Sequence, residues 1–352
     1  DLSAPVALFG RVQKNYFYVG NGSGGDVSAP YSINLVQGLV NAGVQLDSTV
    51  LAAYESWCTA SVNDPDPGFW GHWPRYYAEM PVKQDWIQAA AKRCQTAVVV
   101  IGRSAGEDRE NTLKKGSFYL TNKEKALLDA VTTAFQKVVL VLNIGSIMDF
   151  AEIDAYGDKI SAILLAWQLG MESGNAVADV LTGQVNPSGR LTDTIAKTYA
   201  DYPAQNFGNK AENRYTEDIF VGYRYFETFA PERVLYPFGY GLSYTDFACK
   251  VTKTETKDQT VSVQVQVENT GALPGKQVVQ LYACCPCGAL GKAAKVLIAF
   301  GKTEELAPGK HQTLTLTAPY RHFASFDDSG AAGHKNAWLL EAGDYTFCLG
   351  TD

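Results

Sequence analysis

The sequence lacks any apolar run of the roughly 18–20 residues that a membrane-spanning helix needs. It also lacks an excess of basic charge, because 30 Lys and Arg stand against 37 Asp and Glu, for a net charge of −7. Nucleic acids and anionic membrane surfaces favour basic partners, so the composition argues against both. The N-terminal residues show no basic segment followed by a long apolar stretch, so no signal peptide is visible. We therefore expect no membrane and no nucleic-acid partner.

Cysteines in a regular, paired spacing are missing as well. The seven cysteines are irregularly placed and predict no disulfide framework. Cys284, Cys285 and Cys287 form a cluster, but structural zinc needs four ligands and no second pair follows. We favour free thiols, and no metal, over a metal-thiol module, which stoichiometric bound zinc would reveal. Free thiols and the missing signal favour a cytoplasmic protein, with secretion left open because a signal can be removed.

The first two-thirds of the chain alternates buried strands with amphipathic helices. Four short runs rich in Val, Ile and Leu are typical of strands covered on both faces. They are Val6–Phe9, Ala97–Ile101, Val138–Leu142 and Ala162–Ala166. Thr121 and Glu124 have the spacing of a capping box and predict a helix from about Asn122, and a second helix is expected over 172–181. This order predicts an α/β domain with a mostly parallel, helix-covered sheet.

From about Tyr244 the hydrophobic period changes to two. Val261, Val263, Val265 and Val267 alternate with polar residues, as in a half-buried strand. Turn signals separate further strand-like runs, which are Gln277–Tyr282, Val296–Phe300, Thr313–Thr317 and Tyr345–Leu349. Short strands at this spacing predict an all-β sandwich. We therefore expect two domains, an α/β sandwich over 1–243 and a β-sandwich over 244–352.

The loop that follows the strand Ala97–Ile101 is the first candidate site, because ligands bind at the carboxyl ends of parallel strands. It places three carboxylates and two arginines among small residues that let the backbone approach a ligand. Arginine can donate paired hydrogen bonds to hydroxyls or hold a carboxylate in place. A salt-bridged surface loop would have the same composition. The loop reads Gly102-Arg103-Ser104-Ala105-Gly106-Glu107-Asp108-Arg109-Glu110.

Two other segments invite a functional interpretation. The glycine-rich loop 20–26 lacks the Gly-Lys-Ser/Thr ending of a phosphate loop, so a turn or a loop that borders a site is favoured. The stretch Tyr215–Phe229 is rich in aromatic residues, which stack on sugars but at this density more often pack in a core or an interface. We favour packing for this stretch.

Taken in order, several motifs resemble the C-terminal half of glycoside hydrolase family 3 β-glucosidases. The most specific is Leu235–Tyr244, which reads Leu-Tyr-Pro-Phe-Gly-Tyr-Gly-Leu-Ser-Tyr. The other motifs are Asn21–Asp26, Gly102–Arg109, Val138–Ser146, Leu165–Gly174, Asn186–Leu191 and Tyr215–Phe226. After them follows a sandwich that resembles fibronectin type III, and Phe323–Phe326 falls in its closing part. The resemblance covers nearly the whole chain.

The resemblance implies a retaining β-glucosidase that hydrolyses terminal β-D-glucosyl residues from β-glucosides and short β-glucans. Glu107 falls where the family carries the acid/base glutamate, and Arg103, Ser104, Asp108 and Arg109 are the expected substrate-binding residues. Compared with the family pattern, the loop is slightly shortened before its arginine, next to Asp108 and Arg109. No cofactor is implied.

Family members pair this region with a (β/α)8 barrel, which carries the aspartate nucleophile in a Ser-Asp-Trp/Phe-like segment. No segment of that kind occurs in this sequence. Gln84-Asp85-Trp86 looks similar, but it is predicted to begin a helix. We expect the barrel as a partner, either in the same precursor (removed, or permuted to the C-terminal side) or as a separate chain. A homo-oligomer is compatible with the sequence.

Retaining hydrolysis needs a proton donor with a raised pKa. A bound sugar and the nucleophile carboxylate would raise the pKa of Glu107, whereas Arg103 and Arg109 would oppose this. Two alternatives stay open: the same chemistry on β-xylosides or arabinosides, and a non-catalytic glycan-binding or scaffolding module in which Glu107 is dispensable. Glycan binding by this chain alone would favour the module.

Overall fold

The structure is a computed structural model that describes residues 4–22, 25, 27–60, 63, 74–107, 111–205 and 211–350. By their internal contacts the residues form two compact units, unit 1 (Asp1–Val185) and unit 2 (Asn186–Asp352). Unit 1 is an α/β domain and unit 2 contains the antiparallel sheets, so the predicted fold class is confirmed. No helix among the described residues is long and apolar enough to cross a membrane.

Unit 1 is built on a parallel sheet in the order β1-β2-β3-β4. Its strands are β1 (Val6–Phe9), β2 (Thr96–Arg103), β3 (Lys137–Ile144) and β4 (Ala162–Leu165). In the register, Val6 pairs with Thr96, Thr96 with Lys137, and Val139 with Ala162. Because the strands are parallel, their carboxyl ends meet at one edge of the sheet. The four predicted strands are confirmed to within two residues at each end.

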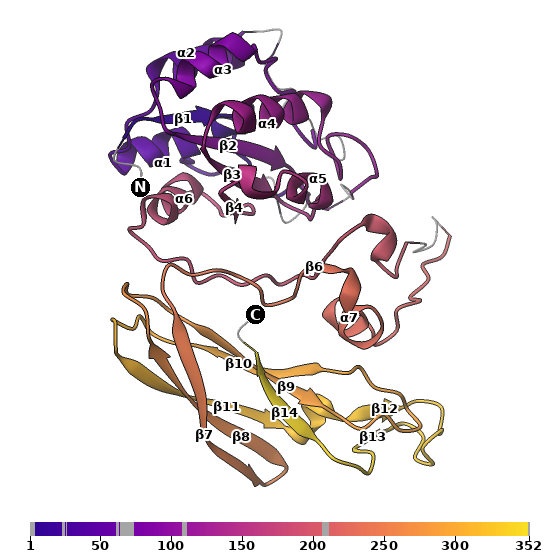
Figure 1. The fold of residues 1–352 in the computed structure, drawn as a ribbon. Helices are drawn as coiled ribbons and strands as arrows, with labels where there is room; N and C mark the ends of the chain where they lie inside the picture. Colours follow the sequence, from indigo (N-terminus) through magenta and orange to yellow (C-terminus); the bar gives the residue numbers. More distant parts are fainter. Residues whose placement is uncertain are drawn as a thin grey trace. The chain divides into compact units, whose positions relative to one another are not determined.

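Helices cover both faces of this sheet (Figure 1). They are α1 (Leu35–Asn41), α2 (Ser48–Thr59), α3 (Gln84–Ala91), α4 (Asn122–Ala134), α5 (Ala151–Asp154) and α6 (Ser173–Thr182), with 3-10 turns η1 (Arg11–Gln13) and η3 (Gly157–Lys159). On one face α1 and α6 pack on Leu8, Val100 and Val141. On the other, Phe9 meets Trp86 of α3 and Phe135 after α4, edge to face. Alternate strand residues therefore enter two apolar layers, which explains the continuous hydrophobic runs.

Unit 2 contains a β-sandwich (Figure 1). One sheet has the strand order β10-β9-β14 and consists of β9 (Val278–Cys284), β10 (Val296–Lys302) and β14 (Thr346–Gly350). The other sheet has the strand order β11-β8-β7 and consists of β7 (Phe247–Lys257), β8 (Thr260–Asn269) and β11 (His311–Pro319). Val263, Val265 and Val267 of β8 face Leu281 of β9 in the core between the sheets. The period-two pattern is confirmed. The eleven-residue β7 was not predicted, because most of its side chains are exposed and polar.

The rest of unit 2 consists of short elements. They are β5 (Ile195–Ala196), η4 (Tyr199–Asp201), α7 (Tyr223–Phe229), η5 (Pro231–Arg233), β6 (Val234–Tyr236), η6 (Tyr320–Phe323), β12 (Ser325–Asp327) and β13 (Ala337–Leu339). In the aromatic stretch Phe226 is fully buried, Phe220 and Phe229 contact at 4.8 Å, and Tyr215 is exposed. Ring contacts support packing for the other aromatic residues of that stretch, Phe220, Tyr223, Tyr225, Phe226 and Phe229.

Several of the described residues in the segment 186–243 contact the sandwich. The Asn186 amide donates to the carbonyl of Pro274 at 2.9 Å, and the Tyr223 hydroxyl accepts from the Leu297 amide at 2.8 Å. In spatial terms this segment belongs to unit 2. The boundary after residue 243, which follows the sequence motifs, stays a prediction about sequence domains.

Candidate active site

The carboxyl edge of the parallel sheet is held together by Asn143, the penultimate residue of β3. Its amide oxygen accepts from the Phe17 backbone N–H at 2.7 Å, and its amide nitrogen donates to the carbonyls of Phe17 (2.8 Å) and Trp167 (2.7 Å). Trp167 lies just after β4 with φ +45°, which is uncommon for a residue other than glycine. Asn143 is fully buried, so it fixes the segments after β1 and β4 beside β3.

Sequence reasoning did not single out Asn143 as a positioning residue. One signal was present, because a polar amide directly follows the apolar run Val138–Leu142 at the end where ligands bind. A buried amide must find partners, and those partners lie up to 126 residues away along the chain. Sequence alone does not identify them.

Glu107 lies on the loop after β2, and this loop pairs with the glycine-rich loop after β1. The Asn21 N–H donates to the Ala105 carbonyl at 2.9 Å, and the Glu107 N–H donates to the Asn21 carbonyl at 3.1 Å. A Cβ on Gly106 would collide with the Asn21 backbone, so only glycine allows this approach. The glycine-rich loop thus borders the candidate site and fixes the backbone of Glu107, whose side chain is exposed.

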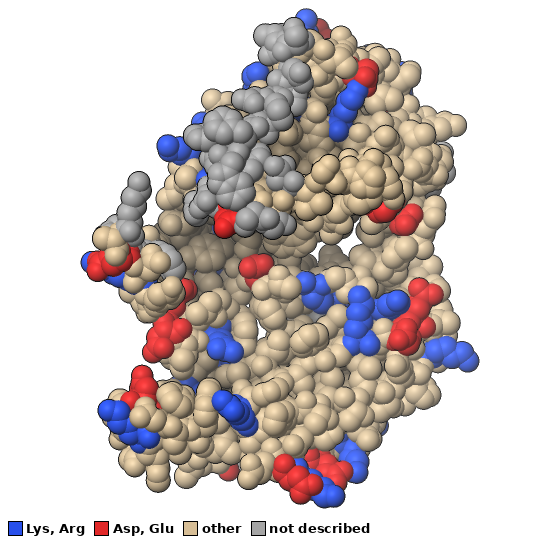
Figure 2. All heavy atoms as spheres, turned by 180° about the vertical axis from the view of Figure 1, so that it is seen from behind, with Lys and Arg blue, Asp and Glu red and all other residues tan. Residues whose placement is uncertain are grey.

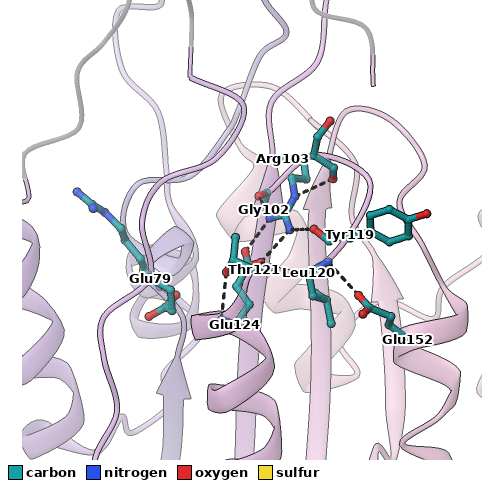
Figure 3. Close-up of polar contacts among 10 residues, drawn as sticks. Glu79, Gly102, Arg103, Tyr119, Leu120, Thr121, Glu124 and Glu152 are labelled. Carbon is teal, nitrogen blue, oxygen red and sulfur yellow. Dashed lines mark hydrogen bonds and ion pairs between the residues drawn. The ribbon is translucent and has the colours of Figure 1, made fainter. Parts of the chain in front are cut away.

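Arg103, the last residue of β2, is buried and bonded entirely within unit 1. Its guanidinium donates to both carboxylate oxygens of Glu124, at 2.7 and 2.8 Å, and to the carbonyls of Ser117 (3.0 Å), Gly102 (2.7 Å) and Tyr119 (3.3 Å). Figure 3 shows this pair at the N-terminus of α4. Since guanidinium has five N–H donors, none remains for a sugar hydroxyl. The structure thus gives no support to the expectation that Arg103 contacts substrate, which stays a prediction.

Glu124 links the loop to helix α4. Thr121 and Glu124 form the predicted capping box, in which the Thr121 N–H donates to the Glu124 carboxylate at 2.7 Å and the Thr121 hydroxyl accepts from the Glu124 N–H at 3.2 Å. Nearby, Glu152 accepts from the Leu120 N–H at 3.1 Å (Figure 3). The capping box is confirmed, and its glutamate also neutralises Arg103 inside the protein.

Ser104 is also buried. Its N–H donates to the Arg75 carbonyl at 2.8 Å and its hydroxyl donates to the Pro74 carbonyl. Its hydroxyl proton is therefore engaged within unit 1. Asp108 and Arg109 lie outside the described residues. Of the predicted site residues, the structure brings Ser104 and Glu107 together on one anchored loop and directs Arg103 inward.

The cysteine cluster is not assembled as a group. The Cys284 thiol lies 3.6 Å from that of Cys348 on the neighbouring strand β14, and the Cys285 thiol contacts the Phe323 carbonyl at 3.8 Å. Among the described residues, no three His, Cys, Asp or Glu side chains are placed to hold a metal ion. The Cys284 neighbour on β14 was not predicted.

Basic and acidic side chains of the described residues are intermingled on the face that Figure 2 shows. Among the described residues some opposite charges are paired, as in the contacts of Lys253 with Glu255 (2.6 Å) and Lys295 with Glu227 (2.7 Å). On that face the charged residues in view do not gather into a field of one sign.

Comparison with protein families matches two parts of the chain. Residues 2–244 match the model described as the glycosyl hydrolase family 3 C-terminal domain, and residues 277–352 match the fibronectin type III-like domain. Among curated proteins, the chain is 45% identical over 353 residues to a β-glucosidase of Ruminococcus albus, covering 100% of this chain and 37% of that protein. It is 39% identical over 389 residues to β-glucosidase A of Butyrivibrio fibrisolvens, covering 98% of this chain and 46% of that protein.

Solved structures agree with this match. A β-glucosidase of Paenibacillus barengoltzii superposes with a TM-score of 0.95 at 45% identity, covering 99% of this chain and 39% of that one. β-Glucosidase 3B of Thermotoga neapolitana, in complex with glucose, superposes with a TM-score of 0.88 at 34% identity, covering 100% of this chain and 49% of that one. The chain therefore spans less than half the length of each of these relatives.

Proposed function

Because the chain belongs to glycoside hydrolase family 3, we propose that it forms part of a retaining β-glucosidase and supplies its acid/base glutamate. The proposal rests on one observation above all: Glu107 is exposed at the carboxyl edge of the parallel sheet, on a loop whose backbone is tied to Asn21. Relatives that are 45% and 39% identical to this chain over the matched residues are named β-glucosidases. The substrate class is β-D-glucosides and short β-glucans.

In the proposed reaction, Glu107 protonates the glycosidic oxygen as the bond to the leaving group breaks. An aspartate from the barrel attacks the anomeric carbon, since retaining enzymes need two carboxyl groups roughly 5 Å apart. The Glu107 carboxylate then takes a proton from water, and that water releases the sugar. The barrel is proposed as a further part of the same polypeptide.

The residues before Glu107 are proposed to position it rather than touch the sugar. Arg103 is neutralised by Glu124, so its positive charge is compensated inside unit 1 instead of being directed at Glu107. The buried Ser104 follows it and fixes the start of the loop. Substrate binding by Asp108 and Arg109 stays a prediction.

The experiment is hydrolysis of an aryl β-glucoside by this chain alone and by the chain mixed with a (β/α)8 barrel of the family. We expect activity only in the mixture, which is called the assembled enzyme below. Activity of the chain alone would overturn the division of the site, because a nucleophile would have to lie within these residues. Glycan binding by the chain alone, with hydrolysis by the mixture insensitive to Glu107→Gln, would favour a non-catalytic module.

Gly22→Ala is expected to lower kcat/KM of the assembled enzyme by about 10–100-fold, because misplacing a catalytic group by about 1 Å has costs of this order. Gly22 has φ +106°, and a Cβ there would collide with the Glu107 side chain and lie 3.1 Å from its carboxylate oxygen. The measurement is steady-state hydrolysis of an aryl β-glucoside.

Gly43→Ala is the matched control, since Gly43 also has a positive φ (+78°) but nothing within 4 Å of its Cβ position. It carries a similar backbone strain without touching Glu107. Equal losses of activity in the two variants would attribute the effect of Gly22→Ala to strain and not to Glu107.

A further inference from the structure

The segment Pro74–Met80, called the strap below, crosses unit 1 without regular secondary structure. Its first residues hold the start of the acid/base loop. The Ser104 N–H donates to the Arg75 carbonyl at 2.8 Å, and the Ser104 hydroxyl donates to the Pro74 carbonyl. Ser104 is three residues before Glu107, so a shift of the strap is transmitted to the loop.

Two tyrosines in the middle of the strap pack on residues around the site. Tyr76 lies with its ring 5.8 Å from the Arg103 guanidinium carbon. Tyr77 stacks on Phe17 at 4.9 Å with the rings nearly parallel, and Phe17 is the residue whose backbone is held by Asn143. The strap is therefore packed against both the β1 and β2 ends of the candidate site.

The far end of the strap is anchored by Glu79, a buried carboxylate. It accepts hydrogen bonds from the N–H groups of Arg11 (2.7 Å) and Met80 (2.8 Å) and from the Tyr54 hydroxyl (3.0 Å). The Arg11 guanidinium also donates to the Ala78 carbonyl at 3.1 Å. Elements η1 and α2 thus hold the strap through the Glu79 carboxylate, and η1 also holds it through the Ala78 carbonyl.

We propose that Glu79 is a positioning residue for the acid/base loop: it anchors the strap, and the strap fixes Ser104 ahead of Glu107. This deepens the proposed function, on which its catalytic consequence rests. Glu79 does not touch substrate. It acts through the backbone of the strap, which runs from Glu79 back to Arg75, and through the hydrogen bond between Arg75 and Ser104.

The charge of Glu79 is sensitive to pH in the neutral range. Burial raises its pKa from an ordinary 4.5 to about 7, while hydrogen bonds from Arg11, Met80 and Tyr54 lower the pKa and the negative charge of Glu124 raises it. On α2, burial also raises the pKa of the Tyr54 hydroxyl and of the Cys58 thiol, so both stay neutral near pH 7. Two cations face the strap: Arg11 on η1 lies near Tyr77 and Ala78, and Arg103 on β2 lies near Tyr76.

Ionisation of Glu79 therefore favours opening of the strap, because the cost of burying its charge exceeds the gain from the three hydrogen bonds to it. Since its pKa is higher in the folded chain than in the unfolded one, its stabilising contribution is complete below pH 4.5 and is lost as pH rises through 7. A shift of this size lowers the folding equilibrium constant by about two orders of magnitude. The strap and the Ser104 contact are expected to open before unit 1 as a whole, because local contacts open at lower free energy.

The test is amide hydrogen exchange of the full chain, measured by NMR at pH 6 and pH 8 and corrected for the intrinsic exchange rate. We expect the protection of the Ser104 amide to fall by about tenfold or more between these pH values in the unmodified chain. Glu79→Gln should remove this pH dependence, and Glu55→Gln, an exposed glutamate on α2, should leave it intact. The amide of Leu39 on α1 serves as the internal reference.

Tyr54→Phe keeps the carboxyl and removes one hydrogen bond that lowers its pKa, so the fall in protection should move to higher pH. The Tyr54→Phe variant tests the proposal if Glu79→Gln does not fold. A Ser104 amide whose protection is independent of pH, or equally dependent in Glu79→Gln, would overturn the proposal. These readouts need no barrel and no activity, so they stand apart from failure of the β-glucosidase proposal.

Discussion

Glu107→Gln is expected to lower kcat/KM of the assembled enzyme about 10²–10⁴-fold on a β-linked glucose disaccharide, and far less on an activated aryl β-glucoside. A sugar leaving group needs protonation as the bond breaks, whereas a nitrophenolate leaves without it. The glutamine keeps the size and the loop position of Glu107 but has no acidic proton. The measurement is steady-state kinetics on the two substrates with the same preparation.

The matched control is Glu110→Gln, the same change three residues further along the loop. Glu110→Gln should lower kcat/KM on the two substrates to a similar extent, and by less than Glu107→Gln lowers it on the disaccharide. If the leaving-group dependence appears in Glu110→Gln instead, the acid/base role moves to Glu110. Equal losses on both substrates in Glu107→Gln would contradict proton donation by Glu107 and leave it a binding role.

Arg103→Met is expected to lower the free energy of unfolding of unit 1 by about 3–5 kcal/mol, because removing one partner of a buried ion pair leaves the other charge uncompensated. Glu124 is buried and keeps its carboxylate close to the N-terminus of α4 (Figure 3). Adding Glu124→Gln should recover part of the loss, since it removes the isolated charge. The recovery is incomplete because Glu124 also caps α4.

Unfolding of unit 1 can be followed by tryptophan fluorescence in a urea titration, since Trp338 is the one tryptophan outside it. Arg93→Met is the matched control. Arg93 also forms two hydrogen bonds with a carboxylate, Asp47, but its side chain is 42% exposed. Asp47 is buried but keeps the hydrogen bond from the Val50 N–H, so a smaller loss than for Arg103→Met is expected. Equal losses of unfolding free energy in the two variants would show that burial does not determine how much the Arg103–Glu124 pair contributes to stability.

Much of the fold was predictable because it depends on local patterns. Continuous apolar runs indicated β1 to β4, and a Thr-x-x-Glu spacing placed the start of α4 at Asn122. Alternation of Val with polar residues indicated β8. The polar strand β7 escaped prediction, since its residues show no burial pattern and its place is fixed by backbone pairing with β8.

The candidate site was predictable in part. The motif around Glu107 marks the loop, and its place after a buried strand puts it at the carboxyl edge of the sheet. The same motif made Arg103 look like a ligand for substrate. An arginine and a carboxylate 21 residues apart on different elements carry no sequence signal that they meet, and only the fold shows that they do.

By itself, therefore, the sequence determined the order of the elements, the two fold types and the glutamate expected to do chemistry. These follow from burial periods, capping and motifs that act within a few residues. The tertiary structure decided which side chains are free to act. Parallel pairing brings Asn21 beside Glu107 and Asn143 beside Phe17. The strap places Arg75 beside Ser104, and helix α4 places Glu124 beside Arg103. Such contacts depend on where strands end in space, which no local pattern encodes.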